Sequence, residues 1–161
     1  MIEMVRVDYR LLHGQVAFSW TQALGANAIF LISNTVQNDP MRLEALKLAK
    51  PVGTKVILKN TDEAIEILRS GVTDKYKVFI ITETVLDAEK ILKATGQRSL
   101  NLGNVAFEYG KQKLSKSVYV DHKEIETIRE MISAGIDLYV QMVPSDKKLK
   151  VEKLLKEMRT N

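Results

Sequence analysis

Three side chains close to the amino terminus have the residue types and the spacing that suit chemistry on a phosphoryl group. They are Asp8, Arg10 and His13, and Gly14 follows directly. A neutral imidazole is a nucleophile that can carry a covalent group, and a guanidinium can bind two oxygens of a phosphate at once. Asp8 would either orient Arg10 or accept the second N–H of the imidazole, which would fix the tautomer of the ring. The spacing therefore suggests a phosphohistidine at His13, with Arg10 as its phosphate clamp.

A plainer interpretation of the same residues stays open at this point. A histidine near a turn is often a surface or capping residue, and Arg10 and Asp8 would then be a solvated loop charge and a turn residue. The second histidine of the chain, His122, lies beside the helix-capping residue Asp121 and is expected at the surface. Spacing alone does not separate chemistry on His13 from the plainer interpretation.

The segments on either side of His13 indicate where it lies. Residues 3–7 form an apolar run typical of a strand, and residues 14–24 have the period of a helix. In an open parallel sheet, ligands bind beyond the carboxyl ends of the strands, toward which helix amino termini also point. The backbone N–H groups at Gly14 and Gln15 would then meet a phosphoryl group on His13, and Gly14 has no side chain to obstruct it.

Strand-like apolar runs alternate with helix-like segments along most of the chain. Strands separated by helices require crossover connections, which predicts a mainly parallel sheet with helices on both faces. The fold class is therefore α/β, with three layers and a sheet of about seven strands. The strand candidates are residues 3–7, 28–33, 55–58, 77–81, 99–102, 117–120 and 136–142.

Capping residues mark the starts of four helices. Asp39 precedes Pro40, and that helix is expected to end before Pro51. Two pairs have the three-residue spacing of a capping box, namely Asn60 with Glu63 and Asp121 with Glu124. The last helix, which is expected to begin at Ser145 or Asp146, has the apolar stripe Val151, Leu154, Leu155 and Met158.

Two segments break the alternation of strands and helices. Residues 100–120 contain no convincing helix, so we expect a loop or hairpin at the rim of the sheet, with 108–113 as a polar, basic loop. Lys111 and Lys113 in that loop would be solvated, or would help to recognise an acidic partner surface. The strict alternation of residues 136–142 suits a strand near an edge of the sheet.

Composition narrows the class of protein. With 161 residues, of which 45% are hydrophobic, the chain is expected to form one domain over residues 1–161. It has no cysteine, no convergent metal-ligand set and no nucleotide-binding glycine motif, so neither a metal nor another cofactor is expected. A net charge of +4 without a cationic block gives no reason to expect nucleic acid as a partner. No apolar run is long enough to span a bilayer, which favours a cytoplasmic protein.

A family resemblance extends the reading of the amino-terminal residues. The segment 6–16, with Trp20 after it, resembles the active-site segment of enzyme IIB subunits of the bacterial sugar phosphotransferase system, mannose/fructose/sorbose family. The resemblance continues in Ala26-Asn27, in Asn38-Asp39-Pro40-Met41-Arg42, in Asn101-Leu102-Gly103, in Gly135-Ile136 and in Gln141-Met142-Val143-Pro144.

The resemblance implies a reaction and a set of partners. His13 would accept a phosphoryl group at Nδ1 from the phosphohistidine of an enzyme IIA, with Arg10 holding the phosphate. It would pass the group to a sugar held by the membrane subunits IIC and IID, so the chain would meet the membrane only through these partners. Asp39 and Arg42 occupy the family's Asn-Asp-x-x-Arg segment and would contact the phosphate, or serve only as a helix cap and a first-turn charge. The implied fold has a seven-stranded, mostly parallel sheet.

The sugar is less closely defined by the resemblance. The residues 101–104, 110–112 and 117–121 are similar to subunits for N-acetylgalactosamine or galactosamine, whereas many mannose and sorbose members have glycine where Asn104 stands. A hexosamine is therefore favoured over mannose, fructose or sorbose.

A second class of function remains on the residues alone. His13 and Arg10 could bind an anion without phosphoryl turnover, in a regulatory module on the same scaffold. A phosphorelay receiver is disfavoured, because Thr82-Glu83-Thr84 follows the central strand where a phosphoacceptor aspartate would be needed. Phosphorylation by IIA separates the two classes.

Overall fold

The protein is a seven-stranded, mostly parallel sheet in the computed structural model, which describes residues 1–160. The strand order across the sheet is β3-β2-β4-β1-β5-β8-β9, and only the β8–β9 pair is antiparallel. The strands are β1 (Ile2–Asp8), β2 (Ala28–Ile32), β3 (Lys55–Lys59), β4 (Val78–Thr82), β5 (Ser99–Asn104), β8 (Asp137–Val140) and β9 (Leu149–Lys150). The expected fold class is confirmed.

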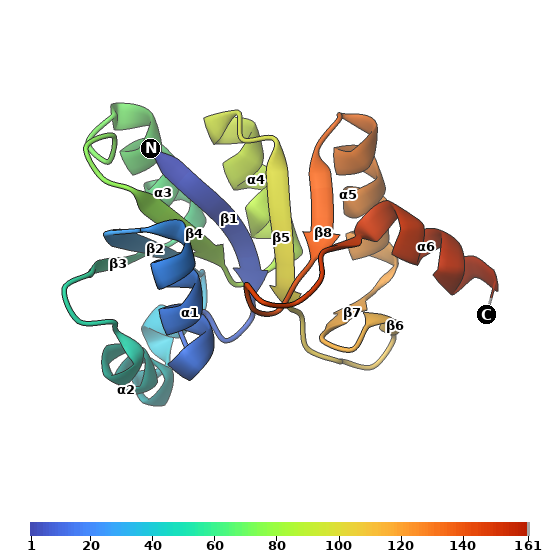
Figure 1. Ribbon diagram of the computed structural model, residues 1–161, viewed down its shortest axis with the longest axis horizontal. Helices are drawn as coiled ribbons and strands as arrows, with labels where there is room; N and C mark the ends of the chain where they lie inside the picture. Colours follow the sequence, from blue (N-terminus) through green and yellow to red (C-terminus); the bar gives the residue numbers. More distant parts are fainter. Residues whose placement is uncertain (161) are drawn as a thin grey trace.

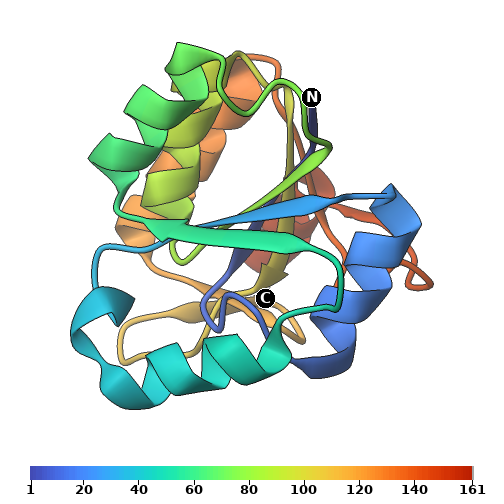
Figure 2. The ribbon, with the colours of Figure 1, turned by 90° about the vertical axis from the view of Figure 1, so that its left-hand side faces the viewer.

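Helices cover both faces of this sheet and make three layers (Figures 1 and 2). One face packs against α1 and α2, whereas α3, α4 and α5 cover the opposite face, to whose core α6 also contributes. The helices are α1 (Gly14–Leu24), α2 (Pro40–Ala49), α3 (Thr61–Ser70), α4 (Val85–Thr95), α5 (His122–Ser133) and α6 (Val151–Thr160). A short 3-10 turn, η1 (Val36–Asn38), precedes α2.

Alternation along β1 sends its side chains into two different environments. Val5 and Val7 join the core under α3, α4 and α5, which is the larger of the two apolar clusters. Arg6 and Asp8 point to the opposite side of β1 and are nevertheless 1% and 0% exposed. Burial of each valine contributes about 1.5 kcal/mol or more to folding, whereas the two charged groups need partners in order to stay buried.

Local capping signals place most helices correctly. Helix α1 has the expected bounds, and α2 starts at Pro40 behind the cap Asp39, whose carboxylate accepts the N–H of Arg42. The capping box of Asp121 and Glu124 is complete at the start of α5. The Asn60 side chain caps α3 by accepting the N–H of Glu63, but the two residues do not form the capping box that the sequence predicted.

The prediction for the last helix was wrong at its start. Helix α6 begins at Val151, after the short strand β9, and neither Ser145 nor Asp146 caps it. Asp146 instead lies in a turn, where its N–H donates to the carbonyl of Val143 and its own carbonyl accepts from the Gln141 side chain. The turn brings the chain back to pair with β8, and the helix cannot start until that pairing ends.

Residues 117–120 contain a strand as predicted, but it lies in the rim hairpin expected within residues 100–120 and is not the seventh strand of the main sheet. The candidate 117–120 is β7 (Val118–Val120), which forms a separate antiparallel hairpin with β6 (Gln112–Ser115) at the rim. The two strands are close in sequence, so their pairing closes only a short loop. Strand β9 takes the edge position, and β8 lies next to it, close to the edge as expected.

Candidate active site

A tight turn joins β1 to α1 and folds the predicted residues back over the end of β1. The carbonyl of Asp8 accepts the N–H of Leu11 at 2.8 Å, and Asp8 Oδ1 accepts the N–H of Arg10 at 3.0 Å. Leu11 has a φ of 60°, which is unfavourable for a branched side chain, and its side chain is buried against α1 and α2. Burial of Leu11 therefore holds the turn in a shape that returns His13 to Asp8.

The His13 imidazole is within hydrogen-bond distance of the Asp8 carboxylate. Its Nε2 is 2.9 Å from Asp8 Oδ2, and the side chains of His13 and Asp8 are 12% and 0% exposed. An ionised carboxylate only accepts hydrogen bonds, so the proton of a neutral His13 ring belongs on Nε2. The ring contacts the protein through Nε2, and this leaves the Nδ1 lone pair for other chemistry. Asp8 was expected either to orient Arg10 or to accept an imidazole N–H, and the structure shows its carboxylate in contact with the imidazole.

His13 is also the residue that precedes the first turn of α1. It has an extended backbone and makes no side-chain cap, and its carbonyl accepts the N–H of Ala17. Gly14 and Gln15 are exposed, and the first turn of α1 contains no acidic residue. The positive end of a helix is therefore open beside the imidazole, which favours an anion there.

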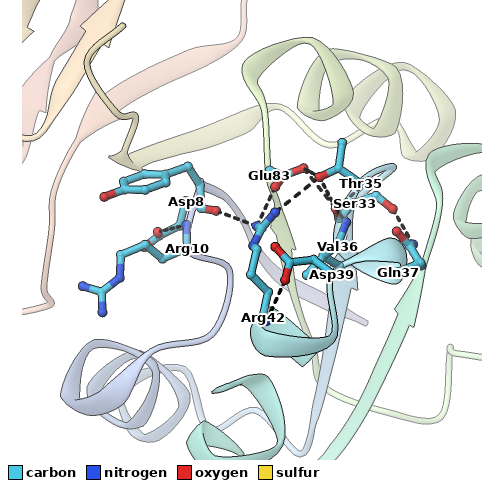
Figure 3. A network of polar contacts seen from close by, with 10 residues as sticks. Asp8, Arg10, Ser33, Thr35, Val36, Gln37, Asp39, Arg42 and Glu83 are labelled. Atoms are coloured by element: carbon cyan, nitrogen blue, oxygen red, sulfur yellow. Dashed lines mark hydrogen bonds and ion pairs between the residues drawn. The ribbon is translucent and has the colours of Figure 1, made fainter. Parts of the chain in front are cut away.

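Arg10 is held by its backbone and not by its guanidinium. Its N–H is bound by Asp8, while the side chain is exposed and extends away from the neighbouring polar network (Figure 3). Asp8 therefore does not orient the Arg10 guanidinium, which was one of the expectations. The Arg10 side chain borders an open cavity of about 410 Å³ at the carboxyl edge of the sheet. A free guanidinium on such a cavity is available to an incoming anion.

Arg42 borders the same cavity, but its guanidinium is already bound. It donates to Glu83 Oε2 at 2.6 Å, to the carbonyl of Tyr9 at 3.2 Å and to Thr35 Oγ1 at 3.4 Å (Figure 3). These contacts tie α2 to the turn after β1 and to the end of β4. Asp39 caps α2 as described, so the helix-cap interpretation of Asp39 has a structural basis. Nothing in the sequence indicated that Glu83 belongs to this cluster, because its partner Arg42 is 41 residues away along the chain.

The structure also reveals a buried charge that the sequence interpretation passed over. The Arg6 guanidinium binds Asn101 Oδ1 at 2.6 Å, the carbonyl of Gln141 at 3.0 Å and Asp8 Oδ2 at 3.1 Å. Gly103 on β5 leaves room for it, because a Cβ there would lie 2.1 Å from Arg6 Cζ. A charged residue between Val5 and Val7 was a signal that could have singled out Arg6.

The rim hairpin is more firmly attached than a solvated loop. Lys111 Nζ lies 3.2 Å from Glu124 Oε1, and both side chains are about one-tenth exposed, so this lysine is not free to bind a partner. Tyr109 is fully exposed and Phe107 is largely exposed. His122 is at the surface as expected, where it contacts Glu126.

The part of the chain that the structure describes has neither a metal-binding cluster nor a membrane-spanning helix. Within residues 1–160 no three acidic or histidine side chains converge as they would around a metal ion. No helix in that range combines the length and the apolar character that crossing a membrane requires.

Comparison with known proteins identifies a matching family and several relatives. A family described as the sorbose subfamily IIB component of the phosphotransferase system (PTS) matches residues 2–161. The N-acetylgalactosamine-specific phosphotransferase enzyme IIB component 1 of Escherichia coli is 29% identical over 91% of this chain and 94% of its own length. The sorbose-specific EIIB component of Lacticaseibacillus casei is 31% identical over 91% of this chain and 90% of its own length.

Two further comparisons concern a longer protein and a solved structure. The mannose-specific EIIAB component of Escherichia coli is 30% identical over 98% of this chain, which spans 49% of that longer protein. The crystal structure of the IIBSor domain of the sorbose permease from Klebsiella pneumoniae superposes with a TM-score of 0.91 at 29% identity, covering 98% of this chain and 97% of that one.

Proposed function

The chain belongs to the sorbose subfamily of PTS IIB components, and from that membership we propose that His13 is the residue that carries the phosphoryl group. A IIB component is a phosphoryl carrier for sugar uptake and a protein-phosphohistidine–sugar phosphotransferase. The non-enzymatic anion-binding module considered above is therefore set aside. The observation that supports His13 best is its contact with Asp8 through Nε2, at 2.9 Å.

The proposed first step forms a bond at Nδ1 of His13. The Nδ1 lone pair attacks the phosphorus of a phosphohistidine on enzyme IIA, and the donor's N–P bond breaks with its electron pair returning to the donor ring. The Asp8 carboxylate stabilises the positive charge that the His13 ring gains when both of its nitrogens are bonded. In the second step a sugar hydroxyl attacks the same phosphorus, the Nδ1–P bond breaks, and the hydroxyl proton is released.

Two groups of the turn after β1 are proposed to bind the phosphoryl oxygens. The Arg10 guanidinium is exposed at the cavity and would neutralise the group that arrives. The open N–H groups at the start of α1, around Gly14 and Gln15, would donate to its oxygens. For Asp39 and Arg42 we propose an indirect role, because the first caps α2 and the second is held by Glu83.

The proposed partners follow from the family membership. We propose a phosphorylated IIA as donor and membrane subunits IIC and IID as the holders of the sugar, with the chain at the cytoplasmic side of the membrane through these contacts. The mannose-specific relative, which is named as an EIIAB component, supports a close working relation between IIA and IIB units. Co-purification with IIC and IID of the same system tests the placement.

For the sugar we propose a hexosamine, with N-acetylgalactosamine first and mannose, fructose or sorbose as the alternatives. The support is the sequence resemblance around Asn104, a residue whose carbonyl binds the N–H of Tyr9 in the active-site turn. The N-acetylgalactosamine, sorbose and mannose relatives have nearly equal identities of 29%, 31% and 30%, so identity gives no preference. Phosphorylation of each sugar by the reconstituted system decides between them.

The nitrogen assignment has its own experiment. Phosphorylation of ¹⁵N-histidine-labelled protein by IIA, followed by ³¹P and ¹⁵N NMR, distinguishes phosphorus on Nδ1 from phosphorus on Nε2. We expect Nδ1. Phosphorus on Nε2 would mean that the ring must leave Asp8 in order to react, which contradicts the proposal.

A further inference from the structure

Arg6 is one of the largest fully buried side chains in the protein, and its guanidinium is surrounded by acceptors. The acceptors come from β5, from the residue after β8 and from Asp8 at the end of β1. Met142 Sδ lies 3.7 Å from Nη2, and Cζ is 5.7 Å from the centre of the Trp20 ring. Burial lowers the pKa of Arg6 while the Asp8 carboxylate raises it. An arginine pKa lies so high that the group remains charged at neutral pH.

The surrounding sequence is arranged to admit this charge. Gly103 lies against the guanidinium where any larger residue would collide with it. Asn101 donates through Nδ2 to the same Gln141 carbonyl that accepts from Arg6, which fixes its Oδ1 toward the guanidinium. A buried cation of this kind contributes little to stability compared with an apolar residue of the same volume. The arrangement therefore suggests a role in addition to stability.

One oxygen links Arg6 to His13. Asp8 Oδ2 lies 3.1 Å from Arg6 Nη2 and 2.9 Å from His13 Nε2, while Asp8 Oδ1 accepts the N–H of Arg10. Asp8 thus has a cation on one side and the imidazole on the other. Because the positive charge of Arg6 lies beside it, the buried Asp8 carboxylate can stay ionised while the His13 ring is neutral.

We propose that Arg6 is a positioning residue for phosphoryl transfer, acting through Asp8 to keep His13 neutral with its proton on Nε2. The inference rests on the proposed function of His13. In the absence of the Arg6 charge, the Asp8–His13 pair would have to bind one more proton to balance the buried carboxylate. That proton would lie on the ring as imidazolium, which blocks Nδ1, or on Asp8, which would then donate to Nε2 and drive the ring proton to Nδ1. Either outcome removes the nucleophile.

A purely structural role for Arg6 predicts a different pattern. Arg6 joins β1 to β5 and to the segment after β8, so any variant that weakens these contacts would loosen the fold. Under that interpretation, loss of the Asn101 contact and loss of the Arg6 charge would have similar effects on His13. The positioning role instead predicts that only loss of the charge changes the protonation of the ring.

The test is ¹⁵N NMR of the His13 ring nitrogens in the unphosphorylated protein at about pH 8, where a free histidine is neutral. The variants are Arg6→Gln, which removes the charge, Arg6→Lys, which keeps it, and Asn101→Ala, the matched control. We expect unprotonated Nδ1 in wild type, Arg6→Lys and Asn101→Ala, and a protonated Nδ1 in a large fraction of Arg6→Gln. Phosphoryl acceptance from IIA should fall about 100-fold in Arg6→Gln and recover at least tenfold in Arg6→Lys.

Several outcomes would overturn the inference. One is unprotonated Nδ1 in folded Arg6→Gln, and another is the same change in Asn101→Ala as in Arg6→Gln. If Arg6→Gln does not fold, Asn101→Asp places a second carboxylate on the guanidinium and must produce the protonated Nδ1 if the proposal is correct. The NMR measurement needs no IIA, so it fails separately from the proposed function, which fails if wild-type His13 is not phosphorylated.

Discussion

The Asp8 carboxylate contacts His13 through Nε2, at 2.9 Å, at the point where β1 ends and α1 begins. This contact assigns different tasks to the two ring nitrogens, since one holds the proton and the other keeps its lone pair. The contact is short in sequence, five residues, but it exists only because the turn at Leu11 brings the chain back over β1.

Replacement of Asp8 by asparagine tests this division of the ring nitrogens. The amide of Asp8→Asn can turn its NH₂ group toward Nε2, which would move the ring proton to Nδ1, so phosphoryl acceptance from IIA should fall about 100-fold. Rapid-quench measurement of label transfer gives the rate. The control is Asp39→Asn, because asparagine caps a helix as well as aspartate does and transfer should not change. Equal rates for Asp8→Asn and wild type would remove Asp8 from the mechanism.

Arg10 provides a test of the phosphate clamp that is independent of folding. Because its side chain is exposed, Arg10→Ala should change the free energy of unfolding by less than about 0.5 kcal/mol, while transfer slows about 100-fold. Arg10→Lys should fall between the two, since lysine supplies the charge without the two-pronged geometry. Lys153→Ala removes an exposed charge from α6 and serves as the control. An unchanged transfer rate in Arg10→Ala would refute the clamp.

Replacement of Gly103 by a larger residue should destabilise the protein, because the Arg6 guanidinium occupies the space that a side chain would need. Its backbone φ lies outside the left-handed region, so Gly103→Ala brings only the collision of a Cβ 2.1 Å from Arg6 Cζ. The expected loss of unfolding free energy is about 2 to 3 kcal/mol, measured by urea denaturation with the fluorescence of Trp20, the one tryptophan of the chain. Gly96→Ala, at a φ of 73° with no atom within 4 Å of the added Cβ, should lose only about 1 kcal/mol from backbone strain. A Gly103→Ala protein as stable as Gly96→Ala would contradict the predicted collision.

Variants of the Arg42–Glu83 pair test whether Arg42 binds the phosphate directly or acts only through its contact with Glu83. A double-mutant cycle with Arg42→Ala and Glu83→Gln should give a coupling of about 0.5 to 1 kcal/mol, since Arg42 is 36% and Glu83 13% exposed. If the pair only shapes the cavity, the two single variants should slow transfer by similar factors, less than about tenfold. A loss in Arg42→Ala that greatly exceeds the loss in Glu83→Gln would show that Arg42 binds the phosphate itself.

Sequence patterns predicted the elements whose signals are local. The bounds of α1 and the caps Asp39 and Asp121 follow from residues within one turn of the helix start, so they could be read directly. Strand β9 could not, because two residues carry no periodicity and its partner β8 determines that it pairs at all.

The residues of the candidate site were likewise predictable from sequence only where they lie close together along the chain. The carboxylate, guanidinium and imidazole of the amino-terminal turn lie within six residues, so their types and spacing made them candidates for an anion site, and the family resemblance pointed to a phosphoryl carrier. Besides Asp8, the partners of Arg6 are 95 and 135 residues away, on β5 and after β8, and only the packed sheet brings them together. Glu83 likewise meets Arg42 across 41 residues.

The central claim is that His13 carries the phosphoryl group, and transfer of ³²P-phosphate from phosphorylated IIA tests it most directly. Wild-type protein should accept acid-labile label up to about one phosphate per chain, as expected for a phosphohistidine, and peptide mapping should place it on His13. His13→Ala should accept none, while His122→Ala, which removes the exposed histidine of α5, should behave as wild type. Label on His13→Ala at the wild-type level, or label mapped to His122, would contradict the account.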